Sequence, residues 1–323
     1  MGGDRLQHPP PVPAGASARP VHPALATPGA VTGDGLAHLL HHGDAATIAR
    51  TVSGIQSRHG NGATGRLVRA AISRKETGLA DPAAVTRFVG EGRKLKANWV
   101  KLATPEARAK CLTDAALAEL KTLKVPEYAV SVEDLGTNSG QFSFAVWTMR
   151  IGKDPFSGSL PSDAAIADLA DTVLHESRHC EQWFRMARFQ AGAGRTSAEI
   201  ATDTKIPPRI CDEAVKQPLS AAGDELTEAQ GWWKSVYGAD RPARRKTLTD
   251  LPVLRQAYET AAKALEQVKA NAASTKEQKD KATKDRDDAF AAYQVVRAKY
   301  VALPEEADAW KLGAAVTAGM LKP

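Results

Sequence analysis

The stretch 162–190 carries the clearest helical pattern in the chain. It contains neither proline nor glycine, and Ser162, directly before Asp163, is a suitable N-cap. Apolar side chains recur there at steps of three, four or seven residues, as they do on one face of a helix: Ile166, Leu169, Val173, Cys180, Phe184 and Ala187. We therefore expect one long amphipathic helix with this stripe turned to the core.

A strand pattern comes directly before this helix. Residues 128–135 alternate between apolar and polar, and residues 141–151 (QFSFAVWTMRI) give the strongest strand signal, with apolar side chains on both faces. Residues 136–140 begin and end with glycine, which predicts a turn between the two strands. The sequence thus predicts a short sheet next to the long helix.

Other helical patterns lie on both sides of this region. They cover about 82–102, 104–123, 210–238 and 251–303. In the second, Thr104-Pro105-Glu106 is a typical N-cap, N1 and N2 sequence. The last consists of two long helices around a polar centre, which we expect to form a hairpin inserted into the main domain. The predicted fold class is α+β, mostly helical.

The first eighty residues differ in composition from the rest. Residues 1–35 hold seven prolines and should form a disordered leader. Residues 36–80 predict a small helical segment, and residues 81–323 the main domain. The N-terminus has no apolar signal-peptide core, no apolar run is long enough for a membrane span, and the three cysteines are widely spaced. We expect synthesis and folding in a reducing cytoplasm.

The net charge of +6 is concentrated in the predicted hairpin. Residues 241–300 hold 14 Lys or Arg against 8 Asp or Glu, which accounts for the whole excess. An anionic partner is one explanation. Aromatic residues are scarce there and no nucleic-acid motif occurs, so a solvated charged hairpin is the better interpretation and a nucleic-acid partner is not expected.

The long predicted helix contains the pentapeptide His175-Glu176-Ser177-Arg178-His179. Histidines four residues apart lie one above the other on a helix and can bind one metal ion. Glu176 is placed to take a proton from a water bound to that ion. The alternative is a surface helix with two incidental histidines. Because motif and helix coincide, the sequence favours a metal site.

The remaining histidines restrict the third ligand. Six of the eight lie at positions 8–59, and none follows His179, which excludes the HExxHxxGxxH pattern. Cys180 is turned about 100° away on the helix, and neither Cys111 nor Cys211 lies in a ligand motif. A downstream Asp or Glu is therefore expected.

Two segments together resemble the ligand segments of gluzincin metallopeptidases: LHESRHCEQWFRMAR (174–188) and YVALPEEADAWKLGAAV (300–316). The resemblance implies a zincin-like core in which Glu306 is the third metal ligand and Asp308 orients a histidine ligand. Pro304 at a helix start places Glu305 and Glu306 in the first turn, where carboxylates are also favoured without any metal.

The chain departs from the gluzincin pattern in two ways. Arg178 is charged where an uncharged residue is usual, and 126 residues separate His179 from Glu306. The predicted hairpin explains much of that length. Three acids closer in sequence remain alternatives for the third ligand: Glu199, Asp212 and Glu213.

The resemblance implies a zinc metalloendopeptidase that hydrolyses a protein or peptide substrate. Zn²⁺ held by His175, His179 and Glu306 would keep a position for water, with Glu176 as the base. An edge strand before the metal helix would pair with the extended substrate. The residue that stabilises the oxyanion is open among Tyr300, Tyr237 and Arg178.

A second resemblance lies near the N-terminus. IQSRHGNGATGRLV (55–68) is similar to the LQRxxGNxAVxRLL helix of proteins linked to bacterial extracellular contractile injection systems. Thr64 and Val68 depart from that pattern, and a small helical hairpin with a Gly-Asn turn explains the segment equally well. The resemblance implies a bacterial effector or toxin, loaded into an injection particle through this segment and delivered to a target cell.

Two other functions remain open. The chain is alternatively a structural or adaptor component of an injection particle with a vestigial metal site, although the intact His175, Glu176 and His179 argue against decay. A metal hydrolase acting on a non-peptide substrate is the third hypothesis, and the order of strand and motif favours peptides over it.

Overall fold

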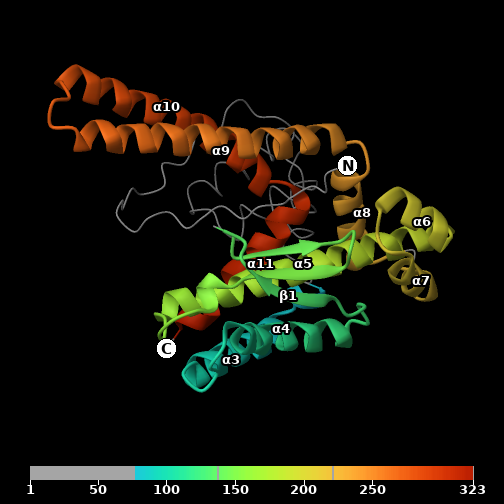
Figure 1. Ribbon diagram of the computed structural model, residues 1–323. Coiled ribbons are helices and arrows are strands. Elements are labelled where there is room, and N and C mark those ends of the chain that lie inside the picture. The colour runs from blue at the N-terminus through green and yellow to red at the C-terminus, as the bar shows by residue number, and fades with distance from the viewer. Residues whose placement is uncertain (1–76, 137, 220–221, 323) are drawn as a thin grey trace, which may run out of the picture. The chain divides into compact units, whose positions relative to one another are not determined.

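The computed structural model describes residues 77–136, 138–219 and 222–322. That part of the chain is mostly helical with one small sheet, as the sequence predicts. The helices (Figure 1) are α3 (Pro82–Asn98), α4 (Pro105–Thr122), α5 (Asp163–Gly192), α6 (Ser197–Thr204), α7 (Pro208–Lys216), α8 (Asp224–Val236), α9 (Arg241–Ala270), α10 (Lys276–Val301) and α11 (Pro304–Leu321). The predicted leader, and the helical segment up to residue 76, lie outside the described residues. None of the described helices is both long and apolar enough to cross a membrane.

Helix α5 is the element on which the others pack; its predicted start is confirmed, and it ends at Gly192, two residues beyond the predicted stretch. Ser162 caps it by accepting a hydrogen bond from the backbone N–H of Ala165 at 3.2 Å. All six residues of the predicted apolar stripe are buried. Helix α11 lies along α5 so closely that a Cβ on Gly313 would overlap the Asp171 carboxylate.

The sheet has three strands: β1 (Ala129–Glu133), β2 (Gly140–Ser143) and β3 (Thr148–Gly152). Their order is β1-β3-β2, with β1 parallel and β2 antiparallel to the central β3. Strand β2 is therefore an edge strand, and it is the strand with the most extensive packing on α5. Figure 1 shows the sheet lying along α5.

The prediction of one continuous strand over 141–151 is wrong, because the chain turns back at 144–147. Trp147 sits in the left-handed region at φ 54°, where a side chain is normally disfavoured. Packing compensates: Trp147 is fully buried, its ring lies edge-on to Phe142 at 5.2 Å, and its Nε1 donates to the Pro126 carbonyl. The turn contains no Gly, Pro or Asn, so the sequence carries no turn signal there.

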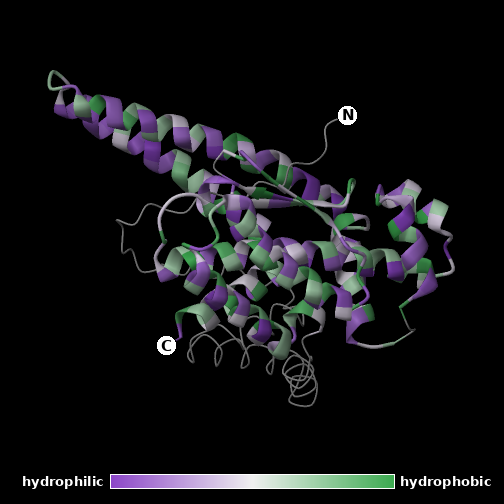
Figure 2. Ribbon diagram, turned by 60° about the horizontal axis from the view of Figure 1, so that its bottom comes forward, coloured by the Kyte–Doolittle hydropathy of each residue, from purple (hydrophilic) through white to green (hydrophobic). Residues whose placement is uncertain are grey.

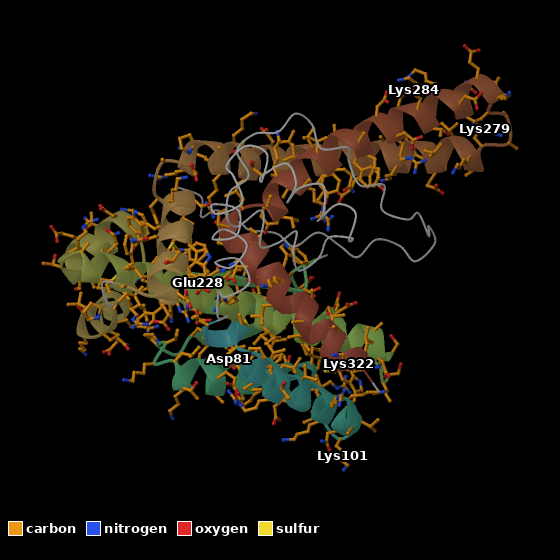
Figure 3. All side chains as sticks on the ribbon, turned by 180° about the vertical axis from the view of Figure 1, so that it is seen from behind. Asp81, Lys101, Glu228, Lys279, Lys284 and Lys322 are labelled. Atoms are coloured by element: carbon orange, nitrogen blue, oxygen red, sulfur yellow. The ribbon has the colours of Figure 1, made fainter. Side chains whose placement is uncertain are left out.

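Helices α9 and α10 form the predicted hairpin, side by side in Figure 1, but α9 begins ten residues earlier than expected. Pro252 lies inside α9. Tyr258 stacks on Tyr293 at 6.1 Å and holds the two helices together. Figure 2 shows hydrophilic and hydrophobic residues mixed along both helices, and in Figure 3 Lys279 and Lys284 mark the charged far end.

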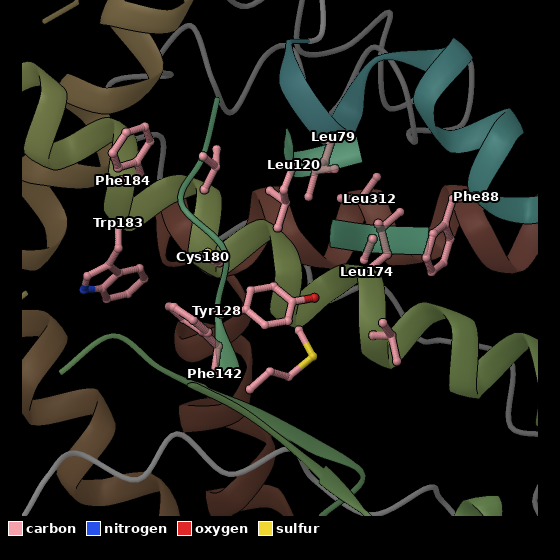
Figure 4. Close-up of a cluster of buried hydrophobic side chains, with 14 of the residues drawn as sticks. Leu79, Phe88, Leu120, Tyr128, Phe142, Leu174, Cys180, Trp183, Phe184 and Leu312 are labelled. Carbon is pink, nitrogen blue, oxygen red and sulfur yellow. The ribbon is translucent and has the colours of Figure 1, made fainter. Parts of the chain in front are cut away.

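The core forms where α5 meets the sheet, α11 and the segment before α3. Figure 4 shows side chains that converge from these elements: Leu79, Tyr128, Phe142, Leu174, Cys180, Phe184 and Leu312. Because this core surrounds the middle of α5, it fixes the helix turns that carry the HExxH motif.

The segment before α3 joins the core through Gly78, and we expect Gly78→Ala to destabilise the fold. Gly78 has φ 67°, and a Cβ there would overlap the buried carboxylate of Glu181. The left-handed conformation and the overpacking together should lower the free energy of unfolding by about 2–5 kcal/mol. Denaturant unfolding checks this prediction, with Gly90→Ala as the control. Gly90 lies in α3 beside open space, so its replacement by Ala should raise the free energy of unfolding by up to about 1 kcal/mol. Equal stability of the two variants would contradict the packing described.

Candidate metal centre

The two histidines of the motif lie on one face of α5 and are almost fully buried. His175 is 1% exposed and His179 is 4% exposed. Their Nε2 atoms are 3.2 Å apart, and the rings meet edge to face with centroids 4.8 Å apart. Both side chains therefore present the same nitrogen to one point beside the helix.

Glu306 reaches this point from the first turn of α11. Its Oε2 atom is 3.8 Å from Nε2 of His175 and 3.6 Å from Nε2 of His179. Ligands about 2.1 Å from a tetrahedral metal lie about 3.4 Å from one another, so the three observed separations fit one ion. Among the described residues these three form the group of His, Cys, Asp and Glu side chains able to hold a metal.

The surroundings of Glu306 also fit a cation. The residue is 0% exposed, and the groups that interact with its carboxylate include the His179 imidazole and the Tyr300 hydroxyl. A fully buried carboxylate is strongly unfavourable unless a positive charge compensates it. Burial alone lowers the pKa of His179, but the neighbouring Glu306 outweighs it and raises that pKa to about 9. Without a metal, a proton on His179 thus supplies the compensating charge.

The acid next to Glu306 turns away, as consecutive helical residues should. Glu305 is also fully buried, but its Oε1 accepts from Nε of Arg244 in α9 at 2.6 Å. This contact ties the start of α9 to the start of α11. The chain therefore returns to α5 after the hairpin.

The three alternative ligands lie elsewhere on the surface. Glu199 caps α6 together with Thr196, Asp212 accepts from Ser197, and Glu213 pairs with Lys216. None of them belongs to the group around His175 and His179.

Glu176 lies between the metal helix and the edge strand. It is 4% exposed, and its Oε2 accepts a hydrogen bond from the backbone N–H of Phe142 at 2.7 Å. Gly152 donates to Ser139, so by the alternation of an antiparallel ladder Phe142 and Met149 form a non-hydrogen-bonded pair, and the Phe142 N–H points away from β3. The sheet thereby holds the predicted base in place.

Gln182, which the sequence does not single out as a site residue, contacts His179. Its Oε1 lies 2.8 Å from Nδ1 of His179. Asp308, predicted to orient a histidine, instead accepts from Nε2 of Gln182 at 2.7 Å and reaches His179 through that amide. The spacing of three residues between His179 and Gln182 is the signal that points to this contact, since such pairs share a helix face.

The unusual Arg178 is buried and paired. It is 0% exposed, its Nε donates to Asp308 at 2.7 Å, and its Nη1 donates to Glu181 at 2.6 Å. Arg178 is therefore committed to these acids. Tyr237 is committed as well, because its hydroxyl donates to the Thr204 carbonyl at 2.9 Å.

Tyr300 is the remaining member of the three proposed oxyanion donors. It is buried, and burial together with the adjacent Glu306 carboxylate raises the pKa of its hydroxyl well above the usual value. The hydroxyl therefore keeps its proton at neutral pH and directs it toward the Glu306 carboxylate.

The chain matches no protein-family model, no curated protein and no solved structure. Its function must therefore be inferred from the site.

Proposed function

We propose that the chain is a zinc-dependent metallopeptidase of gluzincin type with a zincin-like core. The convergence of His175, His179 and Glu306 on one buried point carries this proposal. Two imidazole nitrogens and one carboxylate oxygen are typical of catalytic zinc sites, which keep a further position for water. The separation of 126 residues between His179 and Glu306 makes a chance meeting improbable.

The residues around the site divide the chemistry among them. A bound Zn²⁺ would acidify water and polarise a carbonyl group. Glu176 takes the proton of the attacking water and passes it to the leaving amine, as a general base and then acid. The Phe142 N–H holds the Glu176 carboxylate for this task. Tyr300, with its retained proton, is the proposed donor to the oxyanion.

The edge strand β2 supports a peptide as substrate. Its strand partner in the described sheet is β3, and the Phe142 N–H on its outer side already donates to the Glu176 carboxylate, so a peptide would pair with other groups on this edge. An extended peptide that pairs with this edge would bring its backbone past the site. This arrangement favours a peptide over a non-peptide substrate.

Metal analysis and a cleavage assay test the proposal together. Purified protein should contain about one zinc per chain, and it should cleave unfolded protein substrates in a chelator-sensitive way. Zinc added to chelated protein should restore cleavage. Absence of stoichiometric zinc would refute the metal site. Zinc without cleavage of any peptide would leave the site intact and refute the peptidase.

Zinc affinity should depend on pH through His179. The pKa of about 9 means that the imidazole of the metal-free protein carries a proton at pH 7. That proton must leave before the nitrogen binds a cation, so apparent affinity should rise about tenfold per pH unit below that pKa and level off above it. Calorimetry in buffers of different ionisation enthalpy would also show about one proton released per zinc near pH 7. An affinity independent of pH would contradict the charge balance described.

The N-terminal segment 55–68 supports a proposal about delivery. We infer that the chain is an effector loaded into a contractile injection particle through this segment. Deletion of residues 1–76 should abolish co-purification with particles and leave zinc binding unchanged. Loading of the truncated chain would refute this role.

A further inference from the structure

The orientation of the Gln182 amide is fixed by its surroundings. Its Nε2 donates to the Glu305 carbonyl at 2.8 Å and to Oδ2 of Asp308 at 2.7 Å. Rotating the amide by 180° would set its oxygen against two other oxygens that cannot donate. The amide oxygen must therefore face His179.

This orientation determines which nitrogen of His179 carries a proton. The amide oxygen at 2.8 Å from Nδ1 is only an acceptor, so Nδ1 must be the donor. The unprotonated nitrogen of the neutral ring is then Nε2, the atom that faces His175 and Glu306. A metal ligand needs that lone pair at Nε2.

The contacts that run from His179 through Gln182 to Asp308 end in an ion pair between Asp308 and Arg178. Asp308 accepts from Nε of Arg178 at 2.7 Å and from Nη2 at 3.2 Å, and Arg178 also donates to the Thr77 carbonyl. Asp308 is therefore an anion that only accepts, which is what keeps the Gln182 amide from rotating.

We propose that Gln182, held by the Arg178–Asp308 pair, is the positioning residue of the metal site. It selects the His179 tautomer and aims Nε2 at the position of the ion. A neutral amide thereby takes the place that a carboxylate holds in many histidine metal sites, while the carboxylate sits one contact further out. This inference rests on metal binding in the proposed function and not on peptide cleavage.

Nitrogen NMR of ¹⁵N-histidine-labelled protein tests the tautomer directly. In the zinc-loaded protein, His179 should show a protonated Nδ1 and a metal-shifted Nε2. In metal-free protein at high pH, where the ring is neutral, the proton should again lie on Nδ1. A proton on Nε2 in either state would overturn the proposal. Because the metal-free measurement reports the His179 tautomer without zinc, it distinguishes a wrong tautomer assignment from a failure to bind zinc.

Variants test the chain of contacts. Gln182→Met removes both hydrogen-bonding ends at similar size, and zinc affinity should fall about 10–100-fold. Gln190→Met is the control, because Gln190 lies on α5, is buried, and bonds Arg195 away from the site. Asp308→Asn should weaken zinc binding alone but add nothing to Gln182→Met, since both act through one amide. The proposal would be overturned if the losses of zinc affinity in Gln182→Met and Asp308→Asn added up in the double variant, or if Gln190→Met lost as much affinity as Gln182→Met.

Discussion

Glu176→Gln should keep zinc and the fold but lose peptide hydrolysis by about 10²–10⁴-fold. The amide has nearly the same shape, and its oxygen can still accept from the Phe142 N–H that now holds the carboxylate. What disappears is the capacity to take a proton from water. The loss should therefore fall on kcat, with little change in KM.

The measurement combines zinc content, thermal unfolding and steady-state kinetics on one protein substrate. Glu213→Gln makes the same chemical change in a surface ion pair with Lys216 and should leave all three unchanged. Near-normal turnover of Glu176→Gln would show that the base is another group. Loss of zinc from Glu176→Gln would show that Glu176 is a ligand.

Local signals in the sequence are enough to predict helix α5. Ser162 as N-cap, the absence of Gly and Pro, and the buried stripe all act within one helix, so periodicity reveals them. The same local logic fails for the β2–β3 turn. Its conformation depends on the burial of Trp147 against Phe142, which is a tertiary contact between apolar residues and leaves no turn signature.

The site shows the same division between local and tertiary information. His175, Glu176 and His179 follow from helical spacing alone. Glu306 lies beyond the hairpin, and the residues alone do not favour it over Glu199 as the third ligand. Only the resemblance to gluzincins favours Glu306. The folded chain brings it within 3.8 Å of the histidines.

The neighbourhood of the motif was the least predictable part. Arg178 is an apparent anomaly in the sequence, because its partner Asp308 lies 130 residues away. Its charge becomes understandable once α11 lies on α5, since Asp308 and Glu181 both face the guanidinium. The contact between Gln182 and His179 could be predicted from their spacing of three residues. The orientation of the Gln182 amide could not, because it depends on Asp308 and the Glu305 carbonyl.

Glu306→Gln and Glu305→Gln should have opposite consequences, although the two residues are adjacent, fully buried and of the same type. Glu306→Gln removes the anionic ligand, so zinc affinity should fall by at least about 100-fold, beyond the effect of an orienting contact. The metal-free protein should lose less stability than zinc affinity, because His179 can release the proton that balances Glu306, and both side chains are then neutral.

Glu305→Gln should instead keep zinc and weaken the fold. Arg244 loses its charged partner at 2.6 Å, and one weakened charge-assisted hydrogen bond should cost about 1–3 kcal/mol. Zinc competition against a fluorescent chelator, together with denaturant unfolding in the presence of chelator, separates the two outcomes. Zinc loss from Glu305→Gln with retention in Glu306→Gln would place the third ligand one residue earlier. It would also break the match to the gluzincin helix, because that match depends on Glu306 two residues after Pro304.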